Sequence, residues 1–313
     1  MKNRKFIDHL VRRLSWAELD ENYLAEIVRL ARAEDICGAG LKTAPKDKRD
    51  LTTDTLTPNV GGSAVLAARK DMTLCGLPLI KIILDVYSKF DGEGGCSVKL
   101  LAGDGEKVKK GEAVAEISGP ARTMIRAERV MLNFLQHLSG VATLTSEYVE
   151  ALGESTSKIL DTRKTTPCFR TLEKYAVACG GAYTHRTGLF DRVMLKDNHL
   201  ASSDAVSGAH LADAVRRAKA MNEGYAVEVE VDSISQIAPV LDAGADVVMF
   251  DNFSLEELKE GVKIVGDRAW TEASGGITLG TIAQVGAVGV DFISSGALVH
   301  QSVWIDIGMD WKK

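Results

Sequence analysis

Short apolar runs recur along the second half of the chain, and each of them ends in polar residues. Helical stretches lie between the runs, and strands that alternate with helices predict a parallel sheet, either doubly wound or curved into a barrel. No Gly-x-Gly-x-x-Gly motif follows the first run, which argues against a dinucleotide-binding fold. The six runs cover residues 157–164, 192–198, 226–232, 247–252, 269–276 and 290–297.

The pattern of the first part of the chain is different and indicates an α+β unit. Residues 1–14 and 21–37 are typical of helices, and residues 38–62 of a loop rich in glycine and proline. A strand is expected over residues 63–69, a helix from Pro78 to about residue 90, and short strands between 96 and 118. A long helix follows over residues 122–152. We therefore expect domains at 1–120 and 121–297, with a tail at 298–313 that packs on the first domain.

Composition narrows the class of protein. The chain has 313 residues, of which 45% are hydrophobic and 26% charged, an ordinary globular balance. No apolar run reaches the roughly 18 residues that a membrane span needs. The net charge of −5 gives no support for a nucleic-acid partner. Five cysteines without a CxxC pair predict free thiols in the cytoplasm and neither a disulfide framework nor a zinc site.

The polar residues that end the six runs share a consistent chemistry. The carboxyl ends of barrel strands face one mouth, where barrel enzymes keep their sites. Any one polar residue after a strand can be an ordinary wet loop residue, but six such endings in succession predict a site. The endings are Asp161-Thr162-Arg163-Lys164, Lys196-Asp197-Asn198-His199, Glu228 to Asp232, Asp251-Asn252, Ser274-Gly275-Gly276 and Ser294-Ser295-Gly296.

Three acids alternate with valines in the third run. Side chains alternate between the faces of a strand, so Glu228, Glu230 and Asp232 share one face. Three acids on one face of a buried strand are costly unless a metal, a cation or hydroxyl groups meet them. The alternative is an edge strand with a solvated face, but strands on both sides favour a central position.

Basic groups and glycines complement these acids. Arginine and lysine match carboxylates and phosphates, and Gly275, Gly276 and Gly296 leave backbone N–H groups open to a phosphate. Glu230 and Asp251 could hold Mg²⁺ directly or through water, or ribose hydroxyls. The set predicts a phosphorylated sugar and an anionic second substrate. The basic set is Arg163, Lys164, His185, Arg186 and Lys196, of which His185 taken alone would be a structural histidine.

Several linked motifs, in order, closely resemble the quinolinate phosphoribosyltransferase family (nicotinate-nucleotide pyrophosphorylase, carboxylating). The resemblance covers roughly residues 60 to 310. Its motifs are Ala127-Glu128-Arg129, residues 138–143, residues 161–167, Lys174-Tyr175-Ala176-Val177, His185-Arg186, residues 196–199, 228–232 and 250–253, Ser274-Gly275-Gly276 and Gly289-Val290-Asp291-Phe292.

The resemblance implies an α/β fold, with an N-terminal α/β sandwich domain followed by an incomplete (β/α) barrel of the type II phosphoribosyltransferase kind. It implies that Arg163, Arg186 and Lys196 hold the carboxylates of quinolinate, with Thr162, Lys164 and His185 alongside. The site for phosphoribosyl pyrophosphate and Mg²⁺ would be Glu230 and Asp251, with residues Ser274, Gly275, Gly276, Ser295, Gly296 and Ala297 as phosphate loops. Lys164, Lys196, Glu230 and Asp251 are the residues we expect to be catalytic.

Arg129 has a separate place in this resemblance. The family's arginine in the long helix reaches the neighbouring subunit's site, which implies a homodimer or a larger assembly. Two departures from the family pattern occur, at Cys168-Phe169 and at Thr184. Neither removes a charged ligand, but both could change loop shape and affinity.

The implied activity is formation of nicotinate mononucleotide, CO2 and pyrophosphate from quinolinate and phosphoribosyl pyrophosphate in NAD biosynthesis (EC 2.4.2.19). No Ser/His or Cys/His arrangement is present, and this reaction needs no nucleophilic side chain. Three alternatives remain open: a related type II phosphoribosyltransferase for another base, a lipoyl- or biotin-carrier module suggested by residues 97–118, and an inactive binding protein. A carrier module needs its modified lysine at a hairpin tip, and residues 97–118 contain no such sequence.

Overall fold

The six apolar runs form six parallel strands of one sheet. The computed structural model describes residue 2, residues 4–201 and residues 206–312. The strands follow the order β6-β11-β10-β9-β8-β7, so the first and last members are not paired with each other. This confirms the expected parallel α/β architecture of an incomplete barrel. The strand bounds are β6 Lys158–Leu160, β7 Val193–Leu195, β8 Val227–Val231, β9 Val247–Asp251, β10 Trp270–Ser274 and β11 Phe292–Ser294.

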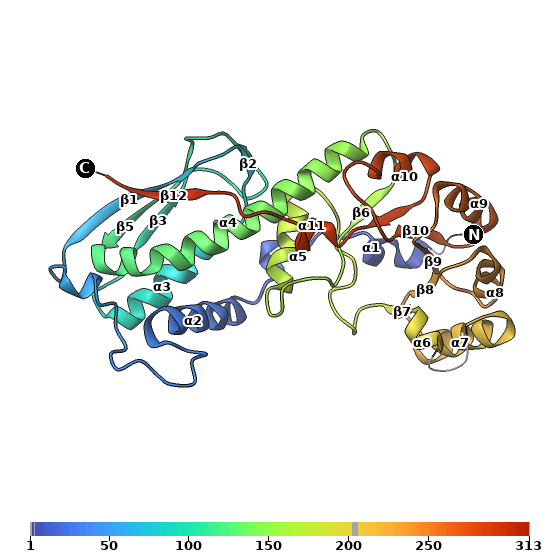
Figure 1. Cartoon of the computed structure of the whole chain (residues 1–313), viewed down its shortest axis with the longest axis horizontal. Coiled ribbons are helices and arrows are strands. Elements are labelled where there is room, and N and C mark those ends of the chain that lie inside the picture. The colour runs from blue at the N-terminus through green and yellow to red at the C-terminus, as the bar shows by residue number, and fades with distance from the viewer. Residues whose placement is uncertain (1, 3, 202–205, 313) are drawn as a thin grey trace. The chain divides into compact units, whose positions relative to one another are not determined.

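Helices return the chain between these strands (Figure 1). Helix α9 starts after Ser254, whose side chain forms a capping box with Glu257. Figure 1 shows α8 and α9 on the outer side of the sheet formed by β8, β9 and β10. The helices are α6 Asp197–Ala201, α7 Gly208–Met221, η4 Ile234–Gln236, α8 Ile237–Asp242, α9 Leu255–Val265, α10 Ile282–Val288 and α11 Ala297–His300.

The start of the chain belongs to this same unit. Phe6 and Leu10 are buried in a core with Leu160, Val247 and Phe292. Single bridges join Arg12 to Thr184 and Leu160 to Tyr183 beside β6, where the sheet has no further strand. The helix expected over residues 1–14 is shorter, because only η1 Arg4–Phe6 and α1 Ile7–Leu10 are helical and residues 1 and 3 lie outside the described part.

A second unit contains an antiparallel sheet of the order β12-β1-β5-β3 and a small sheet of β2 and β4. The unit is assembled from residues 15–144, 171–180 and 302–313, and the barrel unit from residues 1–14, 145–170 and 181–301. The domain limits expected at residues 120 and 297 stay predictions. The strands are β1 Gly61–Ala68, β2 Met72–Thr73, β3 Ser97–Leu100, β4 Lys107–Val108, β5 Ala113–Pro120 and β12 Ile307–Trp311.

The helices of this unit confirm the elements expected from the sequence. α2 begins after Asp20, whose side chain accepts the N–H of Asn22, and ends at Gly38 with φ +67°. Helix α3 follows Pro78. The helices are η2 Trp16–Glu18, α2 Glu21–Cys37, η3 Thr53–Thr55, α3 Leu79–Asp91, α4 Ala121–Leu152, which continues into the barrel unit, and α5 Arg170–Cys179. No helix within residues 2, 4–201 and 206–312 has both the length and the apolar character to cross a membrane.

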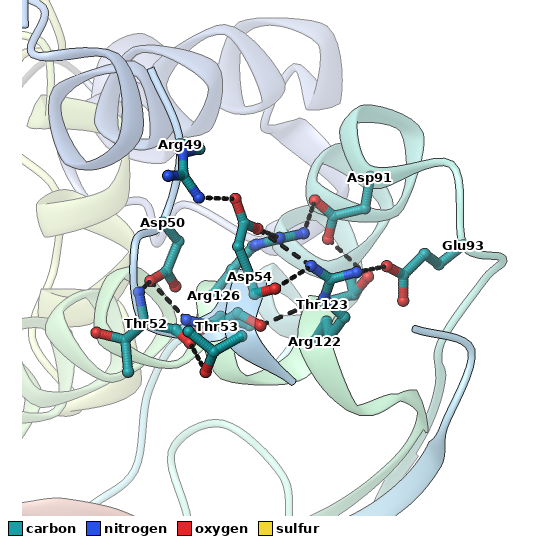
Figure 2. A network of polar contacts seen from close by, with 11 residues as sticks. Arg49, Asp50, Thr52, Thr53, Asp54, Asp91, Glu93, Arg122, Thr123 and Arg126 are labelled. Atoms are coloured by element: carbon teal, nitrogen blue, oxygen red, sulfur yellow. Dashed lines mark hydrogen bonds and ion pairs between the residues drawn. The ribbon is translucent and has the colours of Figure 1, made fainter. Parts of the chain in front are cut away.

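A network of ion pairs holds the loop before β1 against the start of α4. Figure 2 shows Arg122 and Arg126 of α4 paired with Asp54, with Asp91 and Glu93 as further acceptors. Arg126 donates to Asp91 at 2.6 Å, and the Asp91 side chain is fully buried. Arg122 also donates to the backbone carbonyl of Asp54 at 3.2 Å. The network therefore fixes both a loop and the first two turns of α4.

We expect Asp91→Ala to lower the free energy of unfolding by about 3 kcal/mol, because it leaves a buried guanidinium with one carboxylate in place of two. Urea denaturation would measure the change. Asp85→Ala on the same helix is the control, since Asp85 pairs with Lys81 in an exposed i,i+4 bridge worth about 0.5 kcal/mol or less. Equal effects of the two substitutions would contradict a structural role for the network.

Candidate functional site

A cavity of about 560 Å³ opens at the carboxyl ends of the parallel strands in the barrel unit. Barrel enzymes keep their sites at this end, because the loops after the strands converge there. Eleven of the site residues expected from the sequence line it. The lining is Thr162, Arg163, Lys164, His185, Arg186, Met194, Lys196, Glu230, Met249, Asp251, Asn252, Ser274, Gly275, Gly276 and Ser294.

Cations dominate one part of this cavity. Arg163, Lys164, Arg186 and Lys196 all line it, and Arg186 is 7% exposed. Burial and the neighbouring guanidinium of Arg163 lower the pKa of Arg186. The two guanidinium groups repel each other, so an anion between them would remove an unfavourable interaction. The cavity is thus built for a ligand with at least one carboxylate or phosphate.

Carboxylates stand beside these cations. Lys196 Nζ lies 2.7 Å from Glu230 Oε2, and Asn252 donates to Asp251 Oδ2 at 2.8 Å. Glu230 and Asp251 come from the neighbouring strands β8 and β9. Mg²⁺ prefers oxygen ligands and keeps several waters, so two carboxylates suit it as long as substrate oxygens and water complete the shell. The donor set therefore fits Mg²⁺.

Glycine is required where β10 leads into the cavity. Gly275 has φ +91°, and a Cβ there would lie 2.2 Å from Asn252 Oδ1. Asn252 itself has φ +57°, a conformation that asparagine tolerates better than most residues. Any side chain at Gly275 would therefore both strain the backbone and displace Asn252. The turn leaves its backbone exposed toward the cavity, as a phosphate loop requires.

Four buried charged side chains contact one another next to the cavity, which His185 also lines, and we call them the buried charged cluster: His185, Arg192, Glu228 and Glu272. Each is at most 5% exposed as a side chain. Arg192 Nη1 donates to Glu228 Oε2 at 3.0 Å. The acids of the third run were expected to need partners. For Glu228 these partners are an arginine and a histidine.

The members of the cluster shift each other's protonation. Burial raises the pKa of Glu228, but His185 and Arg192 outweigh it and hold the pKa at about 2. Burial and Arg192 lower the pKa of His185, whereas Glu228 and Glu272 raise it, and the net effect is a raised pKa. The carboxylate of Glu228 is therefore ionised at neutral pH.

Four expected site residues do not line this cavity. Arg129 lies in α4, in the part of that helix that belongs to the other unit, and its side chain is exposed. Ser295, Gly296 and Ala297 follow β11, of which Ser294 alone contributes to the lining. Ser295 donates to the carbonyl of Ile277 at 3.3 Å. The roles assigned to these four residues stay predictions.

Arg192 and Glu272 are the cluster members that are not predicted from the sequence. Glu272 could have been found by strand alternation, since it shares a face with Ser274 on β10 just as Glu228 does with Glu230 on β8. Arg192 comes directly before β7 and carries no such pattern. His137 Nε2 in α4 lies 2.8 Å from Glu173 Oε1.

Comparisons with known proteins agree with the geometry. The family model described as "Quinolinate phosphoribosyl transferase, C-terminal domain" matches residues 141–310, and that of the N-terminal domain matches residues 50–139. The "Probable nicotinate-nucleotide pyrophosphorylase (carboxylating)" of Bacillus subtilis is 40% identical over 262 residues, which are 83% of this chain and 87% of the relative.

Two further relatives cover more of the chain. The "Quinolinate phosphoribosyltransferase (decarboxylating) 2b, mitochondrial" of Nicotiana tabacum is 35% identical over 302 residues, 91% of this chain and 81% of that protein. The solved nicotinate-nucleotide pyrophosphorylase from Francisella tularensis superposes with a TM-score of 0.83 at 32% identity, over 96% of this chain and all of that one (100%). The chain therefore belongs to the quinolinate phosphoribosyltransferase family.

Proposed function

We propose that the protein is a quinolinate phosphoribosyltransferase, which converts quinolinate and phosphoribosyl pyrophosphate into nicotinate mononucleotide, CO2 and pyrophosphate in NAD biosynthesis. The observation that carries the proposal is the cavity in which four cations, Arg163, Lys164, Arg186 and Lys196, adjoin the carboxylates of Glu230 and Asp251. A dicarboxylate needs several cations, whereas a ribose with its pyrophosphate needs hydroxyl acceptors and a phosphate loop. Family membership supports the same activity.

The chemistry follows from positioning and charge. The pyridine nitrogen of quinolinate attacks C1 of the ribose while pyrophosphate leaves, through a transition state of oxocarbenium character. Arg163, Arg186 and Lys196 hold the carboxylates, which orients the nitrogen, and Lys164 lies alongside them and adds positive charge near the carboxylates. CO2 then departs from the 2-carboxylate, and the positive ring nitrogen stabilises the electron pair left on C2 until a proton replaces the carboxylate.

We propose Mg²⁺ as the metal. Glu230 and Asp251 would hold it, directly or through water, and it would neutralise the pyrophosphate that leaves. Removal of Mg²⁺ by EDTA is expected to lower the rate by about 100-fold, with recovery after Mg²⁺ is added back. An unchanged rate in EDTA would contradict a role for the metal.

The protein's setting is also a proposal. Arg129 is exposed within its own chain, and we propose that it completes the site of a second subunit in a homodimer or a larger homo-oligomer. All five cysteines are free thiols, which supports a reducing compartment such as the cytoplasm.

The activity is tested by incubating the purified protein with quinolinate, phosphoribosyl pyrophosphate and Mg²⁺. We expect nicotinate mononucleotide and one CO2 per turnover, measured by chromatography and with carboxyl-labelled quinolinate. Nicotinate offered in place of quinolinate is the control, since it lacks the second carboxylate. Turnover of nicotinate without turnover of quinolinate would contradict the proposal and indicate a related phosphoribosyltransferase.

A further inference from the structure

Glu272 is a buried carboxylate in the middle of β10, and its surroundings are unusual. The residue is fully buried in β10, between β9 and β11, and no described residue donates a hydrogen bond to either of its oxygens. The imidazole of His185 lies beside it, with Nε2 3.4 Å from Glu272 Oε1. A buried carboxylate without hydrogen bonds is costly, so its presence calls for a specific reason.

Within the cluster, His185 is the group that faces Glu272. Arg192 Nη1 lies 3.0 Å from Glu228 Oε2, so the arginine is committed to that carboxylate. His185 Nε2 lies 3.4 Å from Glu228 Oε1 as well, and therefore stands between two carboxylates. Arg192 balances the negative charge of Glu228. The negative charge of Glu272 acts on the imidazole alone.

The other ring nitrogen of His185 identifies the tautomer. The backbone N–H of Arg186 donates to His185 Nδ1 at 2.7 Å, so Nδ1 carries no proton. The ring proton must then be on Nε2, which is the nitrogen that faces the two carboxylates. Arg192 Nη1 also lies 3.2 Å from Nε2, and its N–H would be accepted there only in the other tautomer. In that tautomer the backbone N–H of Arg186 would face a second donor and the two carboxylates would lose theirs, so the contacts together favour the proton on Nε2.

We infer that Glu272 is a positioning residue: its charge keeps the proton of His185 on Nε2, so that Nδ1 stays free to hold the backbone N–H of Arg186. The contacts lead from Glu272 in β10, through the imidazole of His185, to Arg186, whose guanidinium lines the cavity. Carboxylates that fix the tautomer of a functional histidine act in the same way in metal sites. The inferred effect on quinolinate binding rests on the proposed function, whereas the effect on His185 does not.

The arrangement has a reason in the charges around Arg186. Arg163 repels its guanidinium, and Asp161 accepts the backbone N–H of His185 at 2.8 Å. The backbone on both sides of the His185-Arg186 bond is thus held by an acceptor. With the proton on Nδ1 instead, the N–H of Arg186 would face another donor, and the backbone at Arg186 would have to shift.

Three variants separate the effects. Glu272→Met has similar size but neither charge nor acceptor, and Glu272→Gln keeps an acceptor without the charge. Thr271→Val is the matched control on the same strand, because Thr271 Oγ1 donates to Asp291 Oδ2 at 2.8 Å, away from the cavity, and its loss weakens the barrel without touching the cluster. Melting temperatures of all variants monitor general destabilisation.

The first measurement needs no substrate. Long-range ¹H–¹⁵N spectra distinguish the tautomers of the six histidines, and a His185→Asn sample assigns the signal of His185. We expect the Nε2–H form in the wild type and in Thr271→Val, a populated Nδ1–H form in Glu272→Met, and an intermediate spectrum in Glu272→Gln. An unchanged His185 signal in Glu272→Met would overturn the inference, whatever the activity of the enzyme.

The second measurement is steady-state kinetics. Glu272→Met is expected to raise KM for quinolinate at least about tenfold, with KM for phosphoribosyl pyrophosphate changed by about twofold or less. Glu272→Gln should fall between this variant and the wild type, and Thr271→Val should match the wild type. A changed His185 tautomer in Glu272→Met without a change in KM for quinolinate would refute the link to Arg186. Absence of quinolinate turnover in the wild type would contradict the proposed function only, since the spectra still decide the role of Glu272.

Discussion

Lys196→Ala is expected to lower kcat/KM for formation of nicotinate mononucleotide by about a thousandfold. The lysine ammonium lies 2.7 Å from Glu230 Oε2 at the end of β7, in a cavity whose ligands are anions. Its removal deletes one cation from the site and leaves the charge of Glu230 uncompensated beside those anions. Loss of one well-placed charge at a developing transition state typically costs 10²- to 10³-fold, and the exposed acid adds to it.

Steady-state rates with quinolinate as the varied substrate measure the change. Lys263→Ala is the matched control, because Lys263 is exposed on α9 and does not line the cavity. Its rates should equal those of the wild type. A Lys196→Ala enzyme within about tenfold of wild type would remove Lys196 from the set of catalytic residues.

Mixed dimers of Arg129→Ala and Lys196→Ala chains are expected to regain about half of the wild-type activity, although each variant alone is nearly inactive. If Arg129 serves the partner's site, one site of the mixed dimer contains both native residues and the other contains neither. Co-expression with two different affinity tags yields the mixed dimers for assay.

A second mixture controls for nonspecific recovery. Lys196→Ala combined with Asp251→Asn alters two residues that line the same cavity, so each barrel of that dimer is defective and no site is restored. If the activity of the first mixture does not exceed that of the second, Arg129 acts in the site of its own chain.

Strand and helix patterns predicted much of the fold, because burial imposes a period on the sequence. Each of the six apolar runs contains a strand, and the polar endings of these runs meet in one cavity, as parallel strands require. The antiparallel strands between residues 96 and 118 were likewise marked by glycine turns, such as the one at Gly105 with φ +88°. In both cases a local pattern carried the information.

Features that depend on residues distant in the sequence could not be predicted from such local patterns. Nothing near Arg192 indicates that its guanidinium lies against Glu228, 36 residues away. The helix expected at the N-terminus shrank to about two turns, because Phe6 and Leu10 pack into the barrel unit and the chain then bridges to Thr184. Arg129 shows the same limit, since its proposed partner would belong to another chain and leaves no periodic trace in this one.

The pairing of β12 with β1 constrains how the protein is made. Ala68 lies opposite Ile307, so the edge of the antiparallel sheet stays open while 239 further residues are synthesised. At ordinary rates of translation that interval lasts roughly 10 to 50 seconds, in which an unpaired strand edge is available to other chains. The antiparallel sheet is completed only after β12 has been synthesised. A nascent chain stalled before β12 is therefore the species in which chaperone binding should be strongest.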